Sequence, residues 1–300
     1  MTMTISSQQT LTLAVYIVAP VNSTTNNNGG RALAIDITPL ATGTQVLSGQ
    51  FSWEGAIKPA YTNSSISGVN VFALWGVVPA TPGPPATRAS SNTVIGTFTT
   101  STSLLDVNSA GKVNGGGGVA SPLAGTVNSI TIASNGRGVL SLTVGSTTYT
   151  YILYLDVAND GNVLGATVGG ANDPTVSFGF FTGQAPTNRF DNTRITGTYV
   201  AGTSMPVVPT VPNAASPFTF TPTGQSGSGA TLTFSGNFSV GSTNGTYLFV
   251  QATGRGTALA SSGQLFQNTN AVFYLITPNI MVVMGGDQSA TADAIGFIQF

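Results

Sequence analysis

The chain has 300 residues, of which 8 are Lys or Arg and 9 are Asp or Glu, so its formal net charge is −1. Charged residues make up 6% of the sequence, against about 25% in an ordinary soluble domain, and most of the surface must therefore be neutral. The absence of His and Cys excludes disulfides, zinc–thiolate sites and catalytic triads with an imidazole base. A net charge near zero also excludes the basic surface of a nucleic-acid-binding protein.

The first predicted element is a strand near the N-terminus. Residues 10–18 alternate along the chain and are rich in β-branched side chains, which is typical of a strand. Leu11, Leu13, Val15 and Ile17 then share one face of it. A polar linker at residues 21–30 follows, so we expect this strand to be separate from the rest of the chain and to need a sheet edge for its backbone groups. It either completes its own unit or is donated to a neighbouring subunit.

The remaining predicted elements are short strands that follow one another to the C-terminus, with turn signals such as Asn-Gly and Asp-Gly between them. They are residues 94–99, 129–133, 139–144, 147–155, 175–181, 231–234, 246–251, 271–276, 280–284 and 294–300. No window has apolar residues at helical spacing over three turns. The pattern predicts an all-β protein built from antiparallel β-barrels or β-sandwiches.

An internal repeat links the two halves of this strand series. Four residues of the first half recur in the same order about 120 residues later: Gly125, Arg137, Tyr154 and Gly179 correspond to Gly245, Arg255, Tyr274 and Gly296. Conserved order at nearly constant spacing indicates duplication. We therefore expect a strand and flexible linker at residues 1–30, a first β unit at 31–188 and a duplicated second unit at 189–300.

The repeated signature consists of a Gly-x-Phe/Tyr opening, a Gly-Arg-Gly hairpin, a strand of the Phe-Tyr-Leu type, and a glycine-flanked closing strand. In this sequence the hairpins are Gly136-Arg-Gly and Gly254-Arg-Gly, and the strands are residues 151–155 and 272–276. The signature resembles that of two-unit secreted proteins abundant in Acidobacteria. The resemblance implies a secreted or surface β-barrel-like protein, and it transfers no catalytic residue.

Two aspartate-containing stretches are similar in part to calcium-binding loops. Residues 106–113 and 156–162 have glycine at the sixth position of a calcium loop. The first lacks an oxygen at the fifth position and the second at the third, and neither has Glu at the twelfth. We expect Asx-type hairpin turns here, and no metal or other cofactor.

The other candidate side chains also have two interpretations. Arg137 and Arg255 could grip the carboxylate of a glycan or of another subunit, or could pair with a local carboxylate beside a tight turn. Glu54 is the sole glutamate, and no spacing gives it a catalytic partner, so we expect no catalytic residue. The aromatic group Phe51, Trp53, Phe72 and Trp75 suits either sugar stacking or, as we expect, core packing.

Four Asn-x-Ser/Thr sequons permit glycosylation at Asn22, Asn63, Asn237 and Asn244. No stretch reaches the eighteen apolar residues of a membrane-spanning helix, and no basic region of a secretory signal begins the chain. The neutral Thr/Ser/Asn/Gly composition favours an extracellular or cell-surface location.

These observations predict a non-enzymatic extracellular structural protein. We expect a homo-oligomer or homopolymer that builds a filament or coat, with Leu11, Leu13, Val15 and Ile17 as the subunit contact. The alternative is a secreted β module that binds a glycan or a small ligand.

Overall fold

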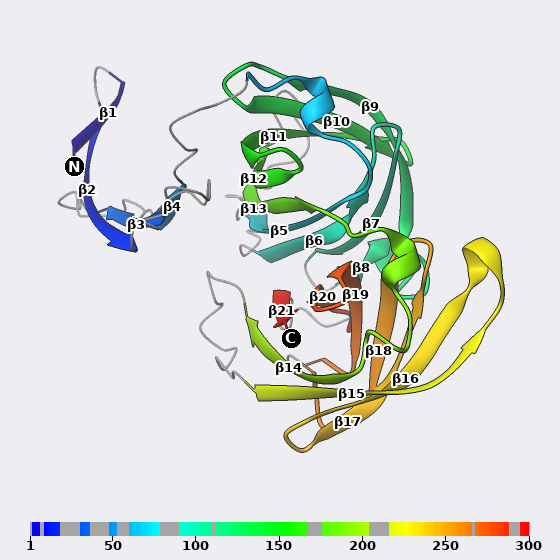
Figure 1. Ribbon diagram of the computed structural model, residues 1–300. Helices are drawn as coiled ribbons and strands as arrows, with labels where there is room; N and C mark the ends of the chain where they lie inside the picture. Colours follow the sequence, from blue (N-terminus) through cyan, green and yellow to red (C-terminus); the bar gives the residue numbers. More distant parts are fainter. Residues whose placement is uncertain are drawn as a thin grey trace, which may run out of the picture. The chain divides into compact units, whose positions relative to one another are not determined.

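The computed structural model describes residues 2–6, 9–18, 31–36, 48–52, 60–78, 90–109, 112–166, 176–203, 216–265, 268–287 and 295–299. In this part of the chain the regular structure is strand, apart from short 3-10 turns (Figure 1). The predicted all-β class is therefore confirmed. The chain divides into two compact units, Met1–Ala60 and Tyr61–Phe300. No helix of the described residues is long and apolar enough to cross a membrane.

The N-terminal unit is an antiparallel sheet of four strands in the order β1–β2–β3–β4. Its strands are β1 (Thr2–Ser6), β2 (Gln9–Val18), β3 (Arg31–Asp36) and β4 (Ser48–Ser52). The predicted strand is β2, which pairs with β1 through residues 9–12 and with β3 through residues 13–18. It is therefore not a lone strand, and β3 and β4, which lie in the range assigned above to the first β unit, belong to the same sheet. The linker at 21–30 lies outside the described residues.

The second unit begins with a nine-stranded antiparallel sheet, called here the curled sheet. Its outermost strand β6 also pairs with β7, from Asn92 opposite Ser109 to Phe98 opposite Ser103, so the sheet bends back on itself. Its strands are β5 (Asn70–Val78), β6 (Ser90–Phe98), β7 (Thr102–Ser109), β8 (Lys112–Val113), β9 (Leu123–Ile132), β10 (Arg137–Val144), β11 (Thr147–Val157), β12 (Asp160–Ala166) and β13 (Val176–Gly183).

The remaining eight strands form a closed barrel in which consecutive strands are neighbours and β21 pairs with β14. The interior is filled by aromatic rings in contact, such as Phe220 and Tyr247 with centroids 5.3 Å apart. Its strands are β14 (Gly197–Thr203), β15 (Ser216–Ser226), β16 (Thr233–Val240), β17 (Thr243–Val250), β18 (Arg255–Ser262), β19 (Asn270–Thr277), β20 (Ile280–Gly285) and β21 (Ile295–Gln299). The expected boundary at residue 188 falls in the 3-10 turn η3 (Thr187–Arg189), between curled sheet and barrel.

A buried aromatic ring, called here the plug, lies against the first residue of each Gly-Arg-Gly hairpin and explains why this residue is glycine. Gly136 and Gly254 have φ angles of +79° and +66°, a region that glycine tolerates best. A Cβ on Gly136 would lie 2.9 Å from the ring of Tyr61, and one on Gly254 would lie 2.9 Å from the ring of Phe190. Both rings are buried, so each hairpin leaves room for an aromatic side chain that belongs to the core of its own sheet.

The register of the two halves is the same around the repeated residues. Arg137 lies opposite Tyr154 in β10–β11, and Arg255 lies opposite Tyr274 in β18–β19. The next hairpins, β11–β12 and β19–β20, each have a register shift between their last two residue pairs. In the strand that follows each hairpin, Gly179 of β13 lies opposite Val163 of β12, and Gly296 of β21 lies opposite Val283 of β20.

The outer faces of the curled sheet and the barrel pack against each other through a third apolar cluster. Val71, Ala73 and Ile95 of β5 and β6 are fully buried there. Their cluster partners are residues of β19 and β20, namely Val272, Tyr274, Ile276, Val282 and Met284. Burial of this apolar surface holds the two sheets together.

Candidate functional site

Asp106 is the centre of a charged network between the curled sheet and the barrel. It lies in β7 with a fully buried side chain, and a carboxylate removed from water needs compensating partners. Arg255 of β18 supplies two of them: its Nε lies 2.7 Å from Asp106 Oδ2 and its Nη2 lies 2.8 Å from Oδ1. The Arg255 side chain is itself only 13% exposed. This two-point geometry is the strongest form of a carboxylate–guanidinium contact.

Two neutral side chains complete the binding of this carboxylate. The Tyr274 hydroxyl donates to Asp106 Oδ2 at 2.8 Å, and Asn114 Nδ2 donates to Oδ1 at 2.7 Å. Asn114 is held in place because its own Oδ1 accepts a hydrogen bond from the backbone N–H of Val107 at 2.8 Å. The buried Asp106 carboxylate therefore has donors from two strands of the barrel and from the 3-10 turn η2 (Asn114–Gly116) that follows β8.

The electrostatics keep the Arg255 guanidinium charged. Desolvation lowers the pKa of Arg255, but the hydrogen bond and the negative charge of Asp106 outweigh it and leave the pKa raised. Burial, followed by the charge of Asp106, raises the pKa of Tyr274 well above its usual value. Tyr274 therefore stays a neutral donor, and the network is suited to holding two surfaces together.

The hairpin expected at residues 106–113 is confirmed, because Ser109 of β7 pairs with Lys112 of β8, but Asp106 is not part of its turn. Asp106 lies inside β7, and its carboxylate is taken by Arg255, so it is not available to a calcium ion. At residues 156–162 the prediction of a hairpin turn is confirmed, because Asn159 with φ of +58° connects β11 to β12. Among the described residues no group of three or more Asp and Glu side chains could hold a metal.

Asp287 forms a second carboxylate clamp, which the sequence did not reveal. Its oxygens accept hydrogen bonds from the backbone N–H of Thr269 at 2.7 Å and of Asn270 at 2.8 Å, and from the Thr269 hydroxyl at 2.9 Å. Burial acts to raise the pKa of Asp287, but these hydrogen bonds outweigh it and the pKa is lowered.

Asp287→Asn is expected to destabilise the protein by about 1.5 kcal/mol at pH 7, the lower end of the range for hydrogen bonds to a charged group, because Asp287 is only partly buried. A lowered folded-state pKa gives stability that is present above the unfolded pKa, near 3.9, and is lost as the pH falls through the folded value. The difference between the variant and the wild type in urea unfolding should therefore shrink toward pH 2. A difference that is constant from pH 7 to pH 2 would show that the charge of Asp287 does not contribute.

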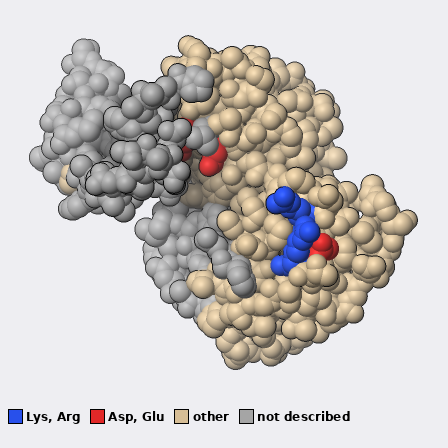
Figure 2. Space-filling model, in the orientation of Figure 1, with Lys and Arg blue, Asp and Glu red and all other residues tan. Residues whose placement is uncertain are grey.

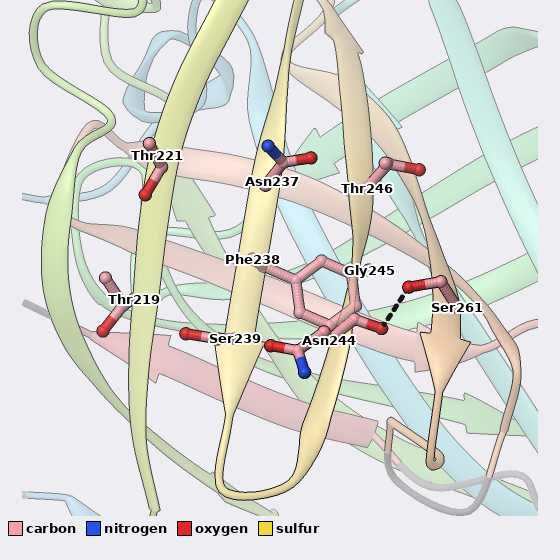
Figure 3. A pocket seen from close by; sticks show the side chains of 9 residues that line it. All are labelled: Thr219, Thr221, Asn237, Phe238, Ser239, Asn244, Gly245, Thr246 and Ser261. Carbon is pink, nitrogen blue, oxygen red and sulfur yellow. Dashed lines mark hydrogen bonds between the residues drawn. The ribbon is translucent and has the colours of Figure 1, made fainter.

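A shallow groove of about 250 Å³ lies on the barrel wall and is lined by neutral polar side chains (Figure 3). Cross-strand register produces it: Thr221, Asn237 and Thr246 are consecutive neighbours across β15, β16 and β17, and Ser239 lies opposite Asn244. The lining residues are Thr219, Thr221, Asn237, Phe238, Ser239, Asn244, Gly245, Thr246 and Ser261. The groove offers hydroxyl and amide groups without any charge, which suits a neutral polar ligand.

Two of the four sequons meet in this groove. Asn237 lies opposite Thr246, the hydroxyl residue of the other sequon, and Asn244 lies opposite Ser239. Both asparagines are exposed, so a glycan on either would cover the groove. Asn63 lies in η1 (Asn63–Ser65), and its Oδ1 accepts a hydrogen bond from the backbone N–H of Ile132 at 2.7 Å. Asn22 is outside the described residues.

The aromatic group is divided by the structure. Phe72 is in the core of the curled sheet, as expected. Trp75 is half-buried on the outer face and contacts Phe178 edge to face, with centroids 4.8 Å apart. Phe51 belongs to β4 of the N-terminal unit, and Trp53 and Glu54 lie outside the described residues.

The chain was compared with models of protein families, with curated proteins and with solved structures, and none of the three comparisons finds a match.

Proposed function

We propose that this protein is a non-enzymatic structural subunit of an extracellular or surface assembly, in which a rigid body of two sheets carries a small sheet that joins copies. The observation that carries the proposal is the contrast between sheets. The barrel is closed and the curled sheet bends back on itself through the pairing of β6 with β7, whereas the described strands of the N-terminal unit form an open sheet. Within the described residues, β1 and β4 each have one paired neighbour.

The use of the few charged residues supports a structural role. Asp106 and Arg255 join two sheets, and Asp287 fixes the backbone at the start of β19. Asp191 accepts hydrogen bonds from the backbone N–H groups of Thr193 and Arg194 at 2.9 and 3.1 Å in the turn before β14. On the face shown in Figure 2, the described surface is mostly uncharged, so little charge repulsion opposes close contact between copies.

We also propose that the two-sheet body arose by duplication. The shared register of the Arg137–Tyr154 and Arg255–Tyr274 pairs supports this, as do the equivalent positive-φ glycines under buried aromatic rings. Independent origins would not be expected to reproduce the register and the plug together.

Assembly through the N-terminal sheet would use its edges. An edge strand presents unpaired N–H and C=O groups that can recruit a strand of another copy. Because β2 is paired on both sides within its own chain, the contact between copies would be made by the edge strands β1 and β4. Residues 11–17 would contribute indirectly, because they hold these strands in one sheet. Head-to-tail pairing of β1 with β4 of the next copy would give a filament.

The double variant Thr4→Lys and Gln50→Lys places a charge on each edge strand, a device that natural edge strands use to block pairing. We expect it to weaken self-association of the full-length chain at least ~10-fold, if each lysine costs about 0.7 kcal/mol or more at the contact. Sedimentation velocity and negative-stain electron microscopy measure this.

The matched control is Thr126→Lys with Ser129→Lys, which adds the same charge at exposed positions of β9. It should assemble as the wild type does. Assembly of the edge variant at wild-type concentrations, or a wild type that stays monomeric at about 100 µM, would rule out the edge contact.

The groove of Figure 3 favours one second candidate, a binding module for a neutral glycan. Its neutral hydroxyl and amide lining matches sugar hydroxyl groups. Thr221→Trp would fill the groove, so it should abolish binding to a glycan array if the groove is the site.

A further inference from the structure

The Arg255–Tyr274 pair acts as a carboxylate receptor inside the molecule. The two residues lie directly opposite each other on β18 and β19, so their side chains leave the sheet on the same face. Together they contact one carboxylate, that of Asp106, through the guanidinium at 2.7 and 2.8 Å and the hydroxyl at 2.8 Å. A cross-strand Arg–Tyr pair in this register therefore reaches both oxygens of one carboxylate, and in the buried site Asn114 adds a further donor to Oδ1.

The curled sheet carries the same pair in the same register, and there it faces solvent. Arg137 lies opposite Tyr154 on β10 and β11. Arg137 is exposed and Tyr154 is 41% exposed, whereas Tyr274 is fully buried. In the part of the chain that the structure describes, neither the guanidinium of Arg137 nor the hydroxyl of Tyr154 has a hydrogen-bond or ion-pair partner.

We propose that Arg137 and Tyr154 form a binding site for the carboxylate of a uronic acid in an acidic polysaccharide. The guanidinium binds both carboxylate oxygens, and the tyrosine hydroxyl donates to one of them, as Arg255 and Tyr274 do with Asp106. The half-exposed ring of Tyr154 offers an apolar surface beside this contact for the sugar ring.

The residues around the pair favour a sugar over a protein surface. The buried pair is surrounded by Ile276 and Val282, which pack against the curled sheet. The corresponding residues beside the exposed pair are Asp156, two positions after Tyr154, and Asn162, opposite Tyr154. Docking a protein sheet here would bury these polar groups at a cost in free energy, whereas a hydrated sugar leaves them in water.

Asp156 also sets the strength of this site. Its Oδ2 accepts a hydrogen bond from Asn162 Nδ2 at 3.4 Å, and its negative charge opposes that of an incoming carboxylate. Binding to a single sugar should therefore be weak, with Kd in the millimolar range, sensitive to salt, and strengthened when several copies of the protein bind one polysaccharide.

The test uses the full-length chain and titrates it with a galacturonic acid tetramer, followed by calorimetry at about 20 mM salt. The methyl-esterified tetramer has the same sugars without the charge. We expect binding of the acid and none of the ester, at least a 10-fold loss of affinity for Arg137→Met, and a several-fold loss for Tyr154→Phe. Arg189→Met removes an exposed arginine elsewhere and should bind as the wild type does.

Equal affinity of Arg137→Met and the wild type, equal binding of the ester, or no binding of the acid at about 10 mM would overturn the proposal. Self-association that Arg137→Met abolishes in the absence of sugar would also overturn it, because the carboxylate would then come from another protein molecule. The site does not depend on assembly through β1 and β4, so either proposal can fail alone.

Discussion

Arg255→Met is expected to lower the free energy of unfolding by about 3–5 kcal/mol, because it leaves the buried Asp106 carboxylate without its countercharge. The methionine keeps much of the volume of the arginine stem, so the loss reflects the charge and the hydrogen bonds more than a cavity. Denaturation by guanidinium chloride, followed by tryptophan fluorescence, measures the effect.

The matched control for Arg255→Met is Arg137→Met. It makes the same chemical change at the corresponding position of the curled sheet, where the side chain is exposed. Its effect should stay within about 0.5 kcal/mol. Similar losses for the two variants would mean that the Asp106 contact does not stabilise the fold.

Phe190→Ala is expected to destabilise the barrel by about 3–5 kcal/mol, the usual cost of removing a buried phenylalanine. Its ring is fully buried in the barrel core and lies against Gly254, and the surrounding strands cannot collapse into the space because they are paired around a closed ring. Thermal unfolding by circular dichroism should show a clear fall in Tm.

The control for Phe190→Ala is Phe178→Ala, which removes the same side chain where it is 43% exposed. It should cost much less, since part of that ring is already in water. A larger loss for Phe178→Ala than for Phe190→Ala would contradict the assignment of Phe190 as the plug of the barrel.

The sequence predicted the all-β class because alternation is a local property of each strand. It also paired Arg137 with Arg255 and Tyr154 with Tyr274, residues that occupy equivalent register positions. Register could not be read directly, but glycines and aromatics with fixed packing roles kept their spacing. The second glycine of the hairpin is one of these, since a Cβ on Gly256 would overlap the ring of Phe273.

The sequence could not predict the partners of the buried charges. Asp106 stands in a stretch that looks like a loop, and its main partner Arg255 is 149 residues away. Nothing local marks such a contact. The groove could not be predicted for a related reason. Its two sequons are recognisable in the sequence, but only the pairing of β16 with β17 brings Asn237 and Asn244 to one face.

The N-terminal sheet shows another limit of the sequence. The alternation of residues 10–18 predicted β2, but the other strands of its sheet, β1, β3 and β4, are five or six residues long and carry weaker patterns. For a strand without recognised neighbours, the sequence leaves open whether it completes its own unit or is donated to another subunit. Its pairing with β1 and β3 removes the need for donation.

A double-mutant cycle between Asp106 and Arg255 tests most directly that this ion pair joins the curled sheet to the barrel. Unfolding free energies are measured for the wild type, Asp106→Asn, Arg255→Met and the double variant. We predict that the double variant is more stable than the sum of the single losses implies, with a coupling energy of about 1.5–3 kcal/mol. Losses that add to within about 0.5 kcal/mol would contradict the contact.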